Sequence, residues 1–148
     1  MSTLREAEAS LVEDLALLGD WNNRYEYIIG LGHDMPPYPD ELRTEDREVY
    51  GCQSQVWLDA RCVDGRVILR ADSNALITKG LIALLVNLYS GRTPKEIMSG
   101  SLDFLKGTGL ATHLTPSRVN GLQAMFKRIR EEAAQCANTE HFSQRKSN

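Results

Sequence analysis

Residues 56–72 read VWLDARCVDGRVILRAD, and this stretch decides the fold class. On both sides of Asp64-Gly65, apolar and polar residues alternate, which is the pattern of a half-buried strand. Asp-Gly favours the two-residue turn of a hairpin, because both central positions of that turn need positive φ. The stretch therefore predicts two antiparallel strands, with Trp57 and Asp59 on the more polar face of the first.

Helices must cover the apolar face of this hairpin, because two strands alone are marginally stable. Capping residues and apolar stripes at helical spacing mark where helices begin. They predict helices that begin near Thr3, Asp20, Ser73, Thr93 and Thr115, the last of them long. Residues near Val49 are candidates for a short third strand. The sequence thus predicts an α+β fold, in which a small antiparallel sheet of about three strands is flanked by several helices.

The length and the C-terminal pattern set the expected domain organisation. A chain of 148 residues is long enough for one domain with its own core, so we expect a single domain over residues 1–148. Beyond Cys136 the apolar pattern ends. We therefore expect residues 138–148 to form a loose tail.

The composition disfavours several classes of protein. Hydrophobic residues make up 42% of the chain and charged residues 25%, as in average globular proteins. The formal net charge is -3 without a basic cluster, so we expect no nucleic-acid partner. The first ten residues lack an apolar core, and the apolar run 81–86 is too short for a bilayer, so we expect no membrane association. Three widely spaced cysteines favour free thiols in a reducing compartment, which predicts a cytoplasmic location.

One of these cysteines lies where a loop leads into the first strand. Residues 51–58 read GCQSQVWL, so Cys52 has a glycine before it and polar residues after it. Gly51 lets the backbone turn sharply, and the polar neighbours can donate hydrogen bonds to the sulfur. These features favour a reactive thiol. A structural or incidental cysteine is the alternative at such a position.

The run from Gly51 to Trp57 resembles the signature of the SufE family of sulfur-acceptor proteins. Further blocks match the family in the same order, and together they cover roughly residues 4–134. These blocks are Trp21 to Gly32, Asp72-Ser73 with the helix containing Lys79-Gly80-Leu81, and His113 to Arg118 followed by Gly121 to Met125. The resemblance implies a SufE/NifU-like α+β domain with its reactive cysteine on a loop at one end.

The resemblance also implies a function. A member of this family accepts persulfide sulfur on Cys52 from a pyridoxal-phosphate cysteine desulfurase of the SufS kind and stimulates that enzyme. It passes the sulfur to iron-sulfur cluster assembly on a scaffold of the SufBCD kind. It acts as a transpersulfidation partner without a cofactor or metal of its own, and a homodimer is compatible with this role. The resemblance makes Arg118 a supporting residue for the sulfur, and His113 and Asp72 also match family positions.

Other readings of the cysteines and of the function stay open at this point. Cys62 shares the apolar face of its strand, so we expect it in the core, and Cys136 is expected to be incidental. A related carrier that serves another desulfurase, for tRNA or other sulfur metabolism, is one alternative, although the chain keeps Gln53, Ser54 and Gln55 of the cluster-assembly branch. A cluster scaffold needs three or four converging soft ligands, and an adaptor would need no thiol.

Overall fold

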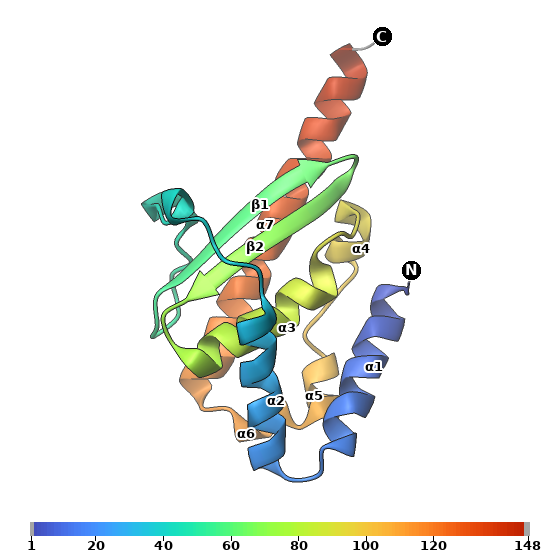
Figure 1. The fold of residues 1–148 in the computed structure, drawn as a ribbon. Coiled ribbons are helices and arrows are strands. Elements are labelled where there is room, and N and C mark those ends of the chain that lie inside the picture. Colours follow the sequence, from blue (N-terminus) through green and yellow to red (C-terminus); the bar gives the residue numbers. More distant parts are fainter. Residues whose placement is uncertain (1, 147–148) are drawn as a thin grey trace.

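The computed structural model describes residues 2–146, with side chains described as far as residue 139. Its helices are α1 Leu4–Leu17, α2 Trp21–Asp34, α3 Leu76–Tyr89, α4 Pro94–Met98, α5 Phe104–Thr108, α6 Leu110–His113 and α7 Pro116–Lys146. Two short 3-10 turns, Asp40–Leu42 and Glu45–Arg47, follow α2 in the chain. The strands β1 Val56–Val63 and β2 Arg66–Ser73 come next and precede α3. In Figure 1 the hairpin crosses in front of α7, while α1, α2 and α3 lie below it. This arrangement confirms the predicted α+β fold class.

The hairpin forms as the sequence predicts. Val56 pairs with Ser73 at one end of the ladder and Val63 with Arg66 at the other. The turn between the strands is made by Asp64 and Gly65, whose φ values are 51° and 74°. Both values are positive, as the two-residue turn requires.

The third strand near Val49 is reduced to a single bridge, so the sheet has two strands in the described part of the chain. The Val49 N–H donates to the Val56 carbonyl at 2.8 Å, and the bridge pairs Glu48 with Trp57. Pairing stops there because Gly51, with φ at 103°, turns the chain away from β1 and towards α7.

The face of β1 that carries Trp57 and Asp59 was predicted to be the more polar one, but it is buried in the N-terminal half of the strand. Trp57 and Asp59 are each less than a tenth exposed, because residues 38–49 fold back over them. Arg43 lies over the Trp57 ring at 4.8 Å, and the Asp59 carboxylate accepts hydrogen bonds from Arg47 and Arg70. Asp59 is thus buried with its charge paired, and the hairpin is covered on both faces near the start of β1.

The central pair of helices packs through glycines. At Gly80 of α3 a Cβ atom would lie 2.3 Å from the carbonyl oxygen of Ile28, and at Gly32 of α2 it would lie 3.0 Å from the Gly80 nitrogen. The backbones of α2 and α3 therefore approach closely where they cross. The close approach accounts for glycine at these two positions, which is otherwise unfavourable inside a helix.

The last helix is longer than the sequence pattern suggested. The predicted loose tail, residues 138–148, is helical as far as Lys146, and residues 147 and 148 lie outside the described residues. After Gly121 the helix contains neither glycine nor proline, so nothing local ends it. In Figure 1 the end of α7 extends past the hairpin.

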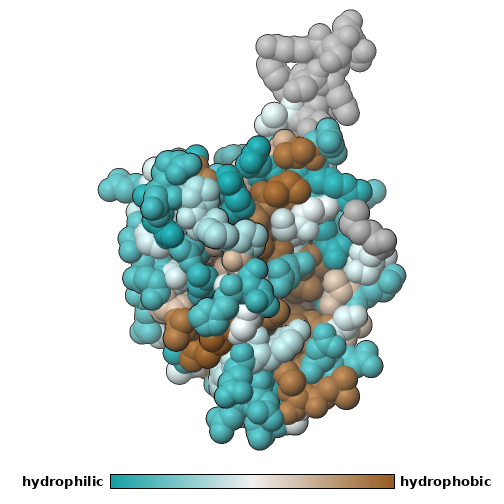
Figure 2. Space-filling model, viewed as in Figure 1, coloured by the Kyte–Doolittle hydropathy of each residue, from teal (hydrophilic) through white to brown (hydrophobic). Residues whose placement is uncertain are grey.

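The core is one cluster that includes buried residues from Leu4 in α1 to Cys136 in α7. Figure 2 shows hydrophilic side chains over most of the visible face, with apolar surface in separate patches. Two of the exposed large apolar side chains are Tyr50, which directly precedes Gly51, and Leu76, the first residue of α3. Among the described residues, no helix has both the length and the apolar character that a membrane span needs.

Candidate functional site

Cys52 lies on a loop that is pressed against α7. A Cβ atom at Gly51 would lie 3.0 Å from the Cβ of Ala124, so only glycine allows both the turn and this close approach. The Cys52 side chain is half-buried, and it is the free cysteine of the described chain.

The Cys52 thiol points at the backbone of α7. Its Sγ lies 3.7 Å from the carbonyl oxygen of Gly121, to which the S–H donates. Burial raises the pKa of the Cys52 thiol above its ordinary value, because desolvation disfavours the thiolate. In this position the sulfur is therefore a protonated, weakly nucleophilic thiol at neutral pH.

The other side of the loop is fixed to the start of α3. The Gln55 N–H donates to the Asn74 side-chain oxygen at 3.2 Å, and the Asn74 N–H donates to the Gln55 carbonyl at 3.4 Å. The hydroxyls of Ser54 and Thr78 are 3.4 Å apart and share a hydrogen bond. The Cys52 loop thus bridges α7 and α3.

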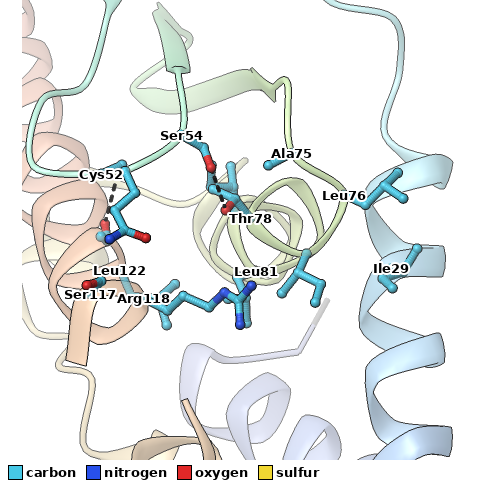
Figure 3. Close-up of a pocket in the computed structure, with 14 residues that line it drawn as sticks. Ile29, Cys52, Ser54, Ala75, Leu76, Thr78, Leu81, Ser117, Arg118 and Leu122 are labelled. Carbon is cyan, nitrogen blue, oxygen red and sulfur yellow. Dashed lines mark hydrogen bonds between the residues drawn. The ribbon is translucent and has the colours of Figure 1, made fainter. Parts of the chain in front are cut away.

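A cavity of about 420 Å³ lies between these two helices and under the loop (Figure 3). Its walls are mainly apolar, with a few polar groups. The apolar walls include Ile29, Leu76, Ile77, Leu81, Ile82 and Leu122, and the polar groups are Gln53, Ser54, Thr78, Ser117 and Arg118. Cys52 lies at the α7 side of the cavity, so a group attached to its sulfur has an adjacent, largely apolar space.

Arg118 lines the same cavity, although the Cys52 hydrogen bond goes to Gly121. Its backbone N–H donates to the Thr115 hydroxyl at 3.3 Å, which caps the first turn of α7. From that turn its side chain extends across the cavity towards α3 (Figure 3). Arg118 is an exposed residue, so it supplies a cationic group at the edge of the cavity, while the hydrogen bond of the resting thiol goes to Gly121.

His113 and Asp72 have structural contacts away from the cavity lining. The His113 ring stacks on Trp21 with the ring centroids 3.7 Å apart. The Asp72 carboxylate accepts from Arg43 at 2.7 Å and pairs with Lys79 at 3.3 Å. Burial opposes its ionisation, but these hydrogen bonds hold the pKa of Asp72 below its ordinary value. Asp72 thereby joins the 38–49 segment, β2 and α3.

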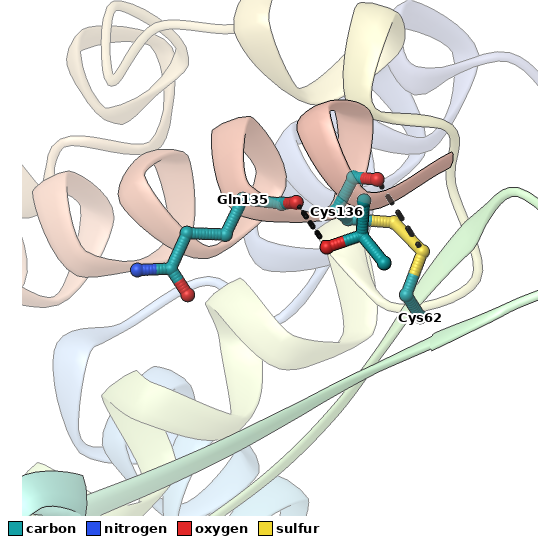
Figure 4. The surroundings of a disulfide bond; sticks show 4 residues. Cys62, Gln135 and Cys136 are labelled. Carbon is teal, nitrogen blue, oxygen red and sulfur yellow. Dashed lines mark hydrogen bonds between the residues drawn. A yellow bond between two sulfur atoms is a disulfide. The ribbon is translucent and has the colours of Figure 1, made fainter. Parts of the chain in front are cut away.

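The other two cysteines correct the sequence prediction. Cys62 of β1 and Cys136 of α7 form a disulfide, with their Cα atoms 5.5 Å apart (Figure 4). The expectation that all three cysteines are free thiols is therefore wrong, and so is the view of Cys136 as incidental. The pairing is not visible in the sequence because 74 residues separate the two cysteines. The expectation of a reducing compartment rested on free thiols, so the disulfide removes the basis for it.

Gly121 belongs to a block that matches the family, but sequence reasoning assigned it no role at the site. A glycine inside a helix was the available signal, because glycine is unfavourable there unless something must approach closely. Asn74 and Thr78 gave no comparable signal, since polar residues are ordinary near the start of a helix. No cluster of three or more His, Cys, Asp or Glu side chains placed to hold a metal occurs in the described part of the chain. Two of the three cysteines are bonded to each other.

The fold and the site define a small α+β protein with a half-buried thiol beside an apolar cavity. The SufE family model, described as an Fe-S metabolism associated domain, matches residues 9–133, and the chain belongs to this family. Membership connects the protein with iron-sulfur metabolism and with a family that works with cysteine desulfurases.

Relatives and a solved structure agree with this assignment. An uncharacterized SufE-like protein of Rhizobium meliloti is 38% identical over 128 residues, covering 83% of this chain and 91% of that protein. One of Synechocystis is 39% identical over 132 residues, covering 89% of this chain and 83% of that protein. The solution structure of a hypothetical protein from Thermus thermophilus superposes with a TM-score of 0.73 over 89% of this chain and 96% of that one. At 22% identity, it supports the fold alone.

Proposed function

We propose that this protein accepts sulfur on Cys52 from the persulfide of a pyridoxal-phosphate cysteine desulfurase and carries it to iron-sulfur cluster assembly. The observation that carries the proposal is the position of the Cys52 thiol, at the wall of a mainly apolar cavity that also contains Arg118. A carrier needs one reactive sulfur and a protected place for the sulfur that it receives. Cys52 and the adjacent cavity supply both.

The transfer is a thiol-disulfide exchange in which electrons are conserved. The Cys52 thiolate attacks the outer sulfur of the desulfurase persulfide. A new S–S bond forms on Cys52, the S–S bond of the desulfurase breaks, and the desulfurase cysteine leaves as a thiolate. No external oxidant or reductant is needed.

Acceptance requires the resting thiol to change its surroundings. A protonated sulfur that donates to the Gly121 carbonyl is a poor nucleophile, and its burial holds the pKa high. We propose that Cys52 leaves this position when the desulfurase docks. Exposure to solvent then returns the thiol pKa towards its ordinary value, which raises the thiolate fraction. The exposed Tyr50, which directly precedes Gly51, and the exposed Leu76, at the start of α3, are available for contact with the partner.

After transfer, the persulfide must survive until delivery. A second thiol nearby would attack it, release sulfide and leave a disulfide. Cys62 and Cys136 cannot do this while they are bonded to each other. The cavity offers the received sulfur a largely apolar environment, and the Arg118 guanidinium would stabilise the negative charge of a persulfide. Arg118 therefore supports the sulfur without being its nucleophile.

The partners follow from this role. The donor is a desulfurase of the SufS kind, and the receiver is a cluster scaffold of the SufBCD kind. The chain stimulates the desulfurase by removing its persulfide, and no resident cofactor takes part. A homodimer and a cytoplasmic location remain predictions.

Intact mass measurement tests the proposal directly. The protein is incubated with a SufS-type desulfurase and cysteine, and we expect the addition of one or more sulfur atoms. Peptide mapping should place the first of them on Cys52, and Cys52→Ser should gain none. The matched control is the Cys62→Ser/Cys136→Ser double variant, which should still accept sulfur. Sulfur found mainly on a cysteine other than Cys52 would overturn the proposal.

A further inference from the structure

The backbone conformation at Gly121 does not require a glycine. It lies in the second turn of α7, and its φ is not among the positive values of the chain. Glycine is less favourable than alanine in a helix interior. A reason for glycine must therefore come from something that packs on this face of the helix.

What packs there is the sulfur of Cys52. A Cβ atom built on Gly121 would lie 3.3 Å from Cys52 Sγ, 3.8 Å from its Cβ and 3.9 Å from its Cα. The first distance is shorter than the contact that a sulfur and a carbon atom prefer. The carbonyl of the same residue accepts the hydrogen bond from the thiol. One residue thus supplies both the space and the acceptor for the resting sulfur.

We propose that Gly121 is a positioning residue that sets how deeply the Cys52 sulfur lies and thereby its reactivity. The proposal deepens the proposed function, since it concerns the same thiol, but it requires no sulfur transfer to be tested. A side chain at position 121 would push the sulfur off the helix. The loop already lies close to α7 one turn further on, where a Cβ atom at Gly51 would be 3.0 Å from the Cβ of Ala124.

The consequences of a methyl group at position 121 are specific. The sulfur must move by a few tenths of an ångström or rotate to another χ1 position, away from the Gly121 carbonyl. It then loses its hydrogen bond and part of its burial. Both changes favour the thiolate, so the thiol should titrate at lower pH and react faster with electrophiles.

The first test is the pH dependence of Cys52 alkylation by iodoacetamide in Gly121→Ala, with the disulfide intact. We expect the profile to shift to lower pH and the rate at neutral pH to rise severalfold. The matched control is Gly30→Ala, which is also a glycine-to-alanine change inside a helix, but its Cβ would have nothing within 4 Å. The control should leave the alkylation profile of Cys52 unchanged. A Gly121→Ala profile identical to that of the wild type would overturn the proposal.

A double-mutant comparison separates positioning from general damage to α7. On the Cys52→Ala background, where the sulfur is absent, Gly121→Ala should raise the melting temperature as alanine does in helices. In the protein that keeps Cys52, Gly121→Ala should raise the melting temperature less, or should lower it. Equal shifts in melting temperature on both backgrounds would mean that the side chain at position 121 does not contact the sulfur. This result would also overturn the proposal. A Cys52 that shows the alkylation shift but never gains sulfur from a desulfurase would instead refute the proposed function alone.

Discussion

Cys62 in β1 and Cys136 in the last third of α7 are joined by a disulfide that closes a loop across 74 residues of sequence separation. The bond ties the hairpin to the helix whose first turns line the Cys52 cavity. It also leaves Cys52 as the free cysteine of the described chain. The disulfide-bonded pair and the free cysteine are thus separated within one small fold.

Reduction of this disulfide should destabilise the protein. A disulfide typically contributes about 2–4 kcal/mol, largely by restricting the unfolded chain, and more for a longer loop. We expect the Cys62→Ser/Cys136→Ser variant, and the wild type in dithiothreitol, to unfold at lower urea concentration than the oxidised wild type. The Cys52→Ser variant is the control, because the reductant should lower its unfolding midpoint as much as it lowers that of the wild type. Identical unfolding midpoints with and without reductant would contradict the pairing.

The raised pKa of Cys52 predicts that its thiol ionises at a higher pH than an ordinary cysteine. Alkylation of the folded protein should reach half of its maximal rate at a pH above the ordinary thiol range, while the urea-unfolded chain should behave ordinarily. Because the folded-state pKa is raised, the contribution of the neutral thiol to stability is present below the ordinary pKa. It is lost as the pH rises through the raised value. Cys52→Ser should lack this alkaline loss of stability, and a profile centred below the ordinary range would contradict the burial argument.

Arg118→Ala should slow sulfur acceptance without unfolding the protein. A charge-assisted contact to a thiolate or persulfide is worth on the order of 1.5–3 kcal/mol, which corresponds to about a tenfold to hundredfold lower rate. Single-turnover transfer from a desulfurase measures this rate. Arg118→Lys should recover only part of it, because an ammonium lacks the planar fork of the guanidinium. An unchanged transfer rate together with weaker desulfurase binding would leave Arg118 a docking role only.

Asp72 should matter for stability and not for the thiol. Its lowered folded-state pKa means that its ion pairs with Arg43 and Lys79 stabilise the fold above the ordinary carboxyl pKa. That stabilisation is lost as the pH falls through the folded-state value. We expect Asp72→Asn to unfold more easily at neutral pH and to lose less stability than the wild type on acidification. Its Cys52 alkylation rate should equal that of the wild type, and a changed rate would give Asp72 a role at the site.

Gly80→Ala should be costly, since its Cβ would lie 2.3 Å from the carbonyl oxygen of Ile28 in α2. Forcing the two helices apart is expected to cost roughly 1–3 kcal/mol of unfolding free energy. Urea denaturation measures it, and Gly30→Ala serves as the helical control with open space around its Cβ. The control should be neutral or stabilising. Similar values for the two variants would contradict the close crossing of α2 and α3.

The sequence alone determined the features that depend on neighbouring residues. Alternation around Asp64-Gly65 specified the hairpin, and capping residues such as Asp20 and Thr93 specified where helices begin. The signature around Cys52 identified the family, which the family model confirms. These signals are local because the period of a strand or helix and the chemistry of a turn or cap are written within a few residues.

Only the tertiary structure decided which distant groups meet. It paired Cys62 with Cys136, covered Trp57 and Asp59 with the 38–49 segment, and stopped the third strand after one bridge. It also placed the Cys52 sulfur on Gly121, which no local pattern links to residue 52. Such contacts depend on how helices and strands pack across long sequence separations, and packing is a property of shape and volume that one stretch of residues does not contain.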